Sequence, residues 1–152
     1  MKKIIISAGV VIILLVTFIV HLSTENRELK KEIGVHYMSV VNHTAIKTKL
    51  YEDIEKDDFA VLLKSHRRTL HTLENSFRFF PDNIKLYAYQ FFLEQNLDID
   101  NYLNNPDFSS SDLENIISRG KIFHQSLLNI KEQLGENPVT WYKEIHYIGP
   151  AK

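Results

Sequence analysis

The sequence predicts an all-α protein with one N-terminal transmembrane helix followed by a compact, antiparallel helical bundle of about four helices. The chain begins with a long apolar run, and apolar residues then recur at spacings of three and four. No later segment alternates apolar and polar residues as a half-buried strand would. We therefore divide the chain into a membrane anchor (1–22), a helical bundle domain (23–148) and a tail (149–152).

The apolar run from Ile4 to Leu22 contains no Asp, Glu, Lys or Arg. A helix of about 19 residues spans roughly 28 Å, which matches the ~30 Å hydrocarbon core of a bilayer. A cleaved secretory signal has a shorter apolar segment, followed by small residues at a defined spacing. Here the chain continues Ser-Thr-Glu-Asn after Leu22. We expect a retained anchor that contacts the lipid bilayer through residues 4–22, with a cleaved signal as the alternative.

Basic residues flank this run on both sides, with Lys2 and Lys3 before it and Arg27, Lys30 and Lys31 after it. The numbers of positive charges on the two sides of the run are therefore nearly equal, and the positive-inside rule alone does not decide the orientation. A short basic tail ahead of an N-terminal anchor usually stays in the cytoplasm. We expect a single-pass membrane protein whose C-terminal domain is extracytoplasmic.

The first helix of the bundle is predicted from Glu25 to about Glu52. Gly34 weakens this helix by about 1 kcal/mol relative to alanine. The charged stretch after the apolar run could continue the membrane helix outward. The apolar positions of this segment include Leu29, Ile33, Val40, Val41, Ile46 and Leu50, with Tyr37 and Tyr51.

A second helix is predicted from residue 59 to residue 80, where apolar positions and one histidine repeat over three heptads. Asp57 and Asp58 are expected to cap its start, and Pro81 to end it. The positions of this stripe are Phe59, Leu63, His66, Leu70, Leu73, Phe77 and Phe80.

A third helix, rich in aromatic residues, is predicted from Ile84 to Gln95, with Asp82–Asn83 supplying the turn and the cap before it. The following stretch, 96–110, reads NLDIDNYLNNPDFSS. Because Asn, Asp, Ser and Pro favour turns, we expect a loop there. Asp98 and Asp100 resemble the start of a calcium loop only faintly, since the required glycine and glutamate are missing.

The fourth helix is predicted to begin at the capping box Ser111–Glu114 and to end at Gly135, a C-terminal cap. Because Gly120 lies in its apolar stripe, a neighbouring helix or a large aromatic side chain is expected close to it. The positions of this stripe are Leu113, Ile116, Gly120, Phe123, Leu127, Ile130 and Leu134. Asn137–Pro138 starts a last short helical element.

The composition argues against several functions. The chain has 18 Lys and Arg against 19 Asp and Glu, and no cysteine. Without a long basic stripe, we expect no nucleic-acid partner. The seven histidines do not share metal-ligand spacing, and glycines do not cluster as in phosphate-binding loops. We expect no catalytic residues, no metal and no cofactor, and therefore no enzyme.

Five residues are candidates for ligand or partner contacts: His66, Arg67, Tyr89, Phe92 and Trp141. His66 lies in the core stripe, so we expect it to be buried and hydrogen-bonded across the bundle. The alternative is a ligand-facing or pH-sensitive polar site that includes Arg67. For the aromatic residues, we expect the C-terminal segment to cover the third helix, and any that stay exposed would mark a partner surface.

These patterns favour a membrane-anchored helical domain at a cell envelope that acts as a protein-interaction or tethering module for a protein partner. The alternative is an extracytoplasmic bundle that senses a ligand or pH and signals through a separate membrane partner. A bundle cavity lined by His66 and other polar groups would favour ligand sensing. A filled core with exposed aromatic residues would favour protein interaction.

Overall fold

The computed structural model describes the backbone of residues 2–53, 56–105 and 110–147, and the side chains of residues 12–52, 62–105 and 111–146. All regular structure in these ranges is helical, which confirms the predicted all-α class. The elements are α1 (Lys2–Thr48), α2 (Leu50–Asp53), α3 (Lys56–Ser76), the 3-10 helix η1 (Phe77–Phe79), α4 (Asp82–Asn104), α5 (Ser110–Leu134) and α6 (Pro138–Tyr147).

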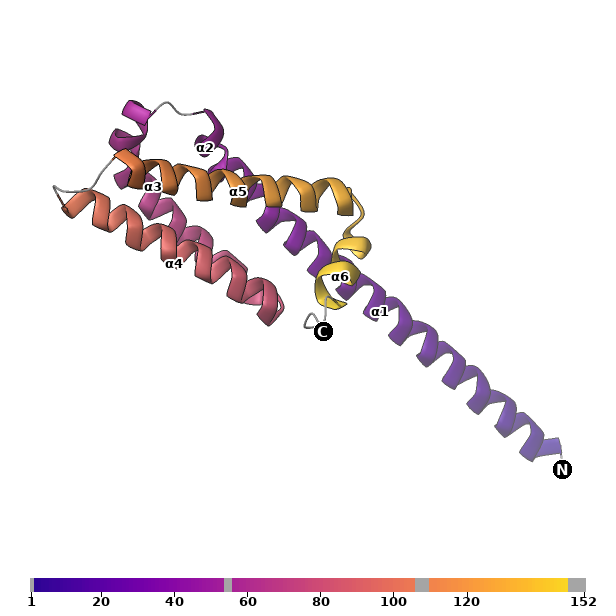
Figure 1. The fold of residues 1–152 in the computed structure, drawn as a ribbon. Helices are drawn as coiled ribbons and strands as arrows, with labels where there is room; N and C mark the ends of the chain where they lie inside the picture. The colour runs from indigo at the N-terminus through magenta and orange to yellow at the C-terminus, as the bar shows by residue number, and fades with distance from the viewer. Residues whose placement is uncertain (1, 54–55, 106–109, 148–152) are drawn as a thin grey trace.

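Helix α1 is one uninterrupted helix of 47 residues, about 70 Å long at 1.5 Å per residue. It crosses the predicted boundary at residue 22 without a break. Figure 1 shows its N-terminal half projecting alone beyond the bundle, while the other helices surround its C-terminal half. The apolar N-terminus and the first helix of the bundle are therefore a single element.

The remaining helices form a bundle against the C-terminal half of α1, as predicted. Helices α3 and α4 form an antiparallel hairpin, and α5 runs back antiparallel to α4 (Figure 1). Helix α5 also packs on α1, and α6 crosses α1 with extensive contacts. The core lies between α1, α3, α4 and α5, and Tyr51 of α2 and Trp141 and Ile145 of α6 also belong to it.

The buried stripe of α1 contains two threonines whose hydroxyl groups bond within the helix. The Thr44 hydroxyl donates to the Val40 carbonyl at 2.8 Å, and the Thr48 hydroxyl donates to the Thr44 carbonyl at 2.9 Å. These bonds satisfy polar groups that would otherwise be costly to bury. The apolar members of the stripe are Tyr37, Val40, Val41 and Ala45.

Two glycines allow close approaches that a larger residue would prevent. A Cβ atom on Gly120 would overlap the ring of Tyr51, which confirms the large aromatic neighbour predicted there. A Cβ atom on Gly34 would overlap the carbonyl of Pro138. Gly34 is therefore the position at which α6 can lie directly against α1, a role that helix propensity alone does not reveal.

The predicted loop at 96–110 is wrong over its first part, because α4 continues to Asn104. Ile99 is fully buried and extends the inward face that starts with Phe92 and Gln95. Burial of this face compensates for the low helix propensity of Asn and Asp. Residues 106–109 of the predicted loop lie outside the described residues.

The acidic residues of this segment form tertiary ion pairs instead of turns. The carboxylate of Asp100 lies 2.6 Å from the guanidinium of Arg67 on α3, and Asp98 pairs with Arg119 on α5. These pairs connect α4 to both of its neighbours. They also explain why Asp98 and Asp100 do not form part of a calcium loop.

The predicted helix ends are mostly correct. Helix α3 and η1 end before Pro81, and Gly135 adopts a φ of 61° with its N–H donating to the Lys131 carbonyl at 2.9 Å. The Asn137 side chain accepts a hydrogen bond from the Val139 N–H at 3.0 Å, as a cap of α6 does. Helix α5 begins at Ser110, one residue ahead of the predicted capping box.

The cap predicted at Asp82–Asn83 is wrong, because Pro81 occupies the N-cap position and Asp82 lies in the first turn of α4. The Lys85 ammonium donates a hydrogen bond of 2.6 Å to the Asp82 carboxylate. This bond and the positive charge of Lys85 hold the pKa of Asp82 below its usual value. The side chains of Asp57 and Asp58, predicted to cap α3, lie outside the described residues.

Within the described side chains, no helix contains a stretch both long enough and apolar enough to cross a membrane. The predicted span starts at Ile4, and the side chains of residues 1–11 lie outside this described set.

Candidate binding cleft

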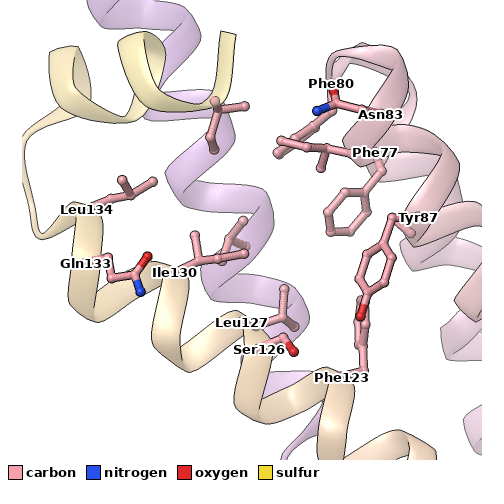
Figure 2. A pocket seen from close by; sticks show the side chains of 14 residues that line it. Phe77, Phe80, Asn83, Tyr87, Phe123, Ser126, Leu127, Ile130, Gln133 and Leu134 are labelled. Atoms are coloured by element: carbon pink, nitrogen blue, oxygen red, sulfur yellow. The ribbon is translucent and has the colours of Figure 1, made fainter. Parts of the chain in front are cut away.

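An apolar cleft of about 250 Å³ lies where the tip of the α3–α4 hairpin diverges from α5 and α6. Figure 2 shows side chains from the hairpin and from α5 facing each other across it, with α1 behind. Val41 from α1 and Ile145 from α6 also line it. Residues of α1, of the turn after α3, and of α4, α5 and α6 therefore contribute to this cleft.

The hairpin wall of the cleft is built by the 3-10 turn after α3. The Phe80 N–H donates to the Phe77 carbonyl at 3.0 Å, which closes the chain tightly. Phe77 and Phe80 are buried with ring centroids 4.9 Å apart, and Phe80 also lies 4.5 Å from the ring of Tyr37. Phe79 points outward and is exposed. The turn thus directs two of three phenylalanines toward the cleft.

The opposite wall follows the predicted apolar stripe of α5. Phe123 stacks on Phe91 of α4 with the ring centroids 3.8 Å apart. This stacked pair closes the cleft at its Phe123 end. Towards the C-terminus of α5 the hairpin wall and α5 separate (Figure 2). Leu127 stays buried there, and Ile130 and Leu134 are partly buried against the core while also bordering the cleft. The stripe residues that line the cleft are Phe123, Leu127, Ile130 and Leu134.

The polar lining of the cleft is limited to neutral groups at its edge. Asn83, Ser126 and Gln133 contribute amide and hydroxyl groups, and Tyr87 contributes a phenol. Among the described residues that line it, none is a carboxylate, an imidazole or a basic side chain. The cleft is therefore suited to an apolar group and offers no general acid or base at neutral pH.

His66 lies in a different part of the core. Its Nε2 atom and the Tyr51 hydroxyl share a hydrogen bond of 2.6 Å, so the histidine is buried and bonded across the bundle, as predicted. Burial lowers the pKa of His66 to about 4 and raises the pKa of Tyr51. Both side chains are therefore neutral at pH 7.

The other four candidate residues are not brought together. Arg67 lies on the surface of α3, and Tyr89 is exposed on α4. Phe92 is fully buried against Phe77 and Phe123. Trp141 is buried, and its indole N–H donates to the Gly135 carbonyl at 2.7 Å.

The C-terminal segment does not cover the aromatic residues of the third predicted helix, so this expectation is wrong. Helix α6 packs on α1 and α5 instead, where Gly34 permits close contact. Tyr87 and Tyr89 of α4 consequently stay exposed. No sequence pattern predicts the cleft itself, because its wall residues have the same periodicity as residues of a filled core.

The described residues contain no group of three or more His, Asp and Glu side chains placed to hold a metal ion. The fold and cleft define a small helical bundle built on one end of a long N-terminal helix. No protein-family model matches this chain, and neither a curated protein nor a solved structure is significantly similar to it.

Burial of neutral His66 predicts a specific loss of stability at acidic pH. The pKa of His66 is 6.5 in the unfolded state, and burial in the folded state lowers this pKa to about 4. The free energy of unfolding is therefore highest above about pH 6.5 and decreases as the pH falls towards 4, by between about 2 and 3 kcal/mol at pH 4.5. In detergent micelles, urea unfolding followed by the fluorescence of Trp141 should show this loss.

The variant His66→Gln should be less stable at pH 7 but should lack this part of the pH dependence. The control His71→Gln changes an exposed histidine of the same helix and should behave like the wild type. An unchanged pH dependence in His66→Gln would show that His66 is not the group responsible.

Proposed function

We propose that this chain is a single-pass, membrane-anchored interaction module. In this proposal, the N-terminal half of α1 lies in the bilayer, and the bundle binds a protein partner of the same membrane through the apolar cleft. The bundle acts by position and contact and has no catalytic role.

The anchor is supported by the exposed apolar surface of α1. Nine large apolar side chains between Ile12 and Leu22 are 47% to 66% exposed, and none of the described helices covers them (Figure 1). A helix that is apolar on all sides requires lipid or protein around it. Together with residues 4–11 of the same helix, the run has the length of a bilayer span.

Binding of a protein partner is supported above all by the cleft, an apolar depression that the chain leaves open at one end of its core. A partner helix could place one or two apolar side chains between the hairpin and α5, as in other helix-in-groove complexes. Anchoring both proteins in one membrane raises their effective concentration, so a small contact is sufficient.

The lining of the cleft supports protein interaction over the sensing alternative. His66 does not line the apolar cleft: it is bonded to Tyr51, and it borders a smaller pocket of about 170 Å³ with Lys47, Ser65 and Thr69. The cleft therefore lacks the polar interior that a sensor of polar ligands requires, whereas Tyr87 and Phe79 are exposed near it.

The anchor is tested by fractionation of cells that express the full chain. The protein should stay in the membrane pellet after alkaline carbonate extraction and should retain its N-terminal residues by intact mass. Leu15→Arg combined with Ile19→Arg should release it, because each arginine costs about 3 kcal/mol at the centre of a bilayer. A wild-type protein that begins after Leu22 and is soluble would contradict the anchor.

The cleft is tested by filling it. Ser126→Trp places a large ring at its edge and should reduce crosslinking to the membrane partner, in intact membranes, by about tenfold, as expected when an anchoring contact is blocked. Ser118→Trp makes the same change at an exposed position of α5 and should leave crosslinking unchanged. Equal yields for the two variants, with both proteins folded, would exclude the cleft as the contact surface.

A further inference from the structure

The outer surface of the α3–α4 hairpin carries a basic face that the proposed function does not use. Lys64, Arg67, Arg68 and His71 follow one another at i, i+3, i+4 and i+7, which places them on one side of α3. With Glu74 and two residues of α4, Leu93 and Asn96, they line a groove of about 620 Å³. We call these four residues the basic face.

The basic face keeps an excess of positive charge. Arg67 is paired with Asp100 at 2.6 Å, and His71 lies 3.7 Å from Glu74. Lys64 and Arg68 are exposed and form no ion pair with any described side chain. Among the described residues, these two cations beside the groove therefore have no carboxylate partner, in a chain whose net charge is −1.

Next to the groove, α4 presents an exposed apolar strip. Four large side chains follow at spacings of three and four and are 42% to 64% exposed. The core face of α4 carries Phe92 and Ile99, so the strip lies on a different side of the helix. Aligned apolar side chains of this kind mark an interaction surface. The strip consists of Leu86, Tyr89, Leu93 and Leu97.

We propose that this groove binds an acidic amphipathic helix of a protein partner. The apolar side of that helix would lie on the strip of α4, and its Asp and Glu side chains would face Lys64 and Arg68. Opposite charges beside an apolar contact orient a bound helix and exclude basic competitors. The surface is separate from the cleft, which α4 lines with Asn83, Ile84, Tyr87 and Ala88.

The position of the groove along the molecule favours a protein over a lipid surface. His66, next to Arg67, is bonded to Tyr51, which lies just beyond the end of α1. At about 1.5 Å per residue, the end of α1 lies about 40 Å from Leu22 along the helix axis. This step rests on the proposed anchor: with the apolar run in a bilayer, headgroups would lie far from the basic face.

Binding can be measured with a designed helical peptide. Its leucines repeat at i, i+3, i+4 and i+7, all other positions are glutamate or alanine, and a fluorophore is attached. The matched peptide has lysine in place of each glutamate. Full-length protein in phosphatidylcholine nanodiscs is titrated against each peptide by fluorescence anisotropy, and empty nanodiscs provide the background.

The glutamate peptide should bind at least about tenfold more tightly than the lysine peptide, and raising NaCl from about 50 to about 500 mM should weaken it, because salt screens exposed charges. Lys64→Glu with Arg68→Glu should weaken it about tenfold, whereas Lys121→Glu with Lys143→Glu, at exposed positions elsewhere, should not. Leu93→Gln should also weaken binding, but the exposed Ile122→Gln should not.

Three results would overturn the proposal that the groove binds an acidic helix. These are equal affinity for both peptides, no affinity above empty nanodiscs, and equal effects of the two charge reversals. Tighter binding to phosphatidylserine vesicles than to the peptide, lost in the same double variant, would assign the surface to lipid and also overturn it. A failed groove with an intact Ser126→Trp effect on crosslinking would leave the membrane-anchored interaction module standing.

Discussion

The rest of the structure depends on the continuity of α1, which joins the apolar N-terminus to the centre of the bundle in one helix. A helix fixes both the distance and the rotation between its residues, at about 1.5 Å and 100° per residue. The exposed apolar surface before Leu22 and the buried stripe that begins near Gly34 are therefore held in one rigid relation. A flexible linker would let the bundle turn freely, whereas this helix holds the surfaces of the bundle at a fixed distance and rotation from the apolar N-terminus.

The arrangement of the bundle depends on a small residue on the surface of α1. Gly34 lets α6 lie against α1, and α6 is consequently not available to cover α4. At the same end of the core, the 3-10 turn after α3 holds Phe77 and Phe80 inward. The walls of the hairpin and of α5 then separate, and the apolar cleft lies between them (Figure 2). One glycine contact and one tight turn thus explain why the core is open there.

Much of this fold is predictable from local patterns, but the exceptions have physical causes. Periodic apolar residues identify α3 and α5, and Gly135 marks the end of α5 because it must adopt a positive φ. The extension of α4 through Asp98 and Asp100 is not predictable, because it depends on arginines that are distant in sequence. Periodicity likewise identifies the residues that line the cleft. It does not show that the hairpin and α5 diverge there, because this depends on tertiary contacts. His66 is predictable as a buried polar residue, whereas its partner Tyr51 comes from another helix.

The continuity of α1 is tested most directly by a distance measured along it. The chain has no cysteine, so spin labels can be placed uniquely by Ser23→Cys and Ile46→Cys, two exposed positions of α1. In lipid bilayers, double electron–electron resonance should give a single narrow distance distribution near 35 Å, the rise of a straight helix over this interval. A broad distribution, or one centred well below this distance, would show a hinge between the apolar run and the bundle and would contradict the rigid connection.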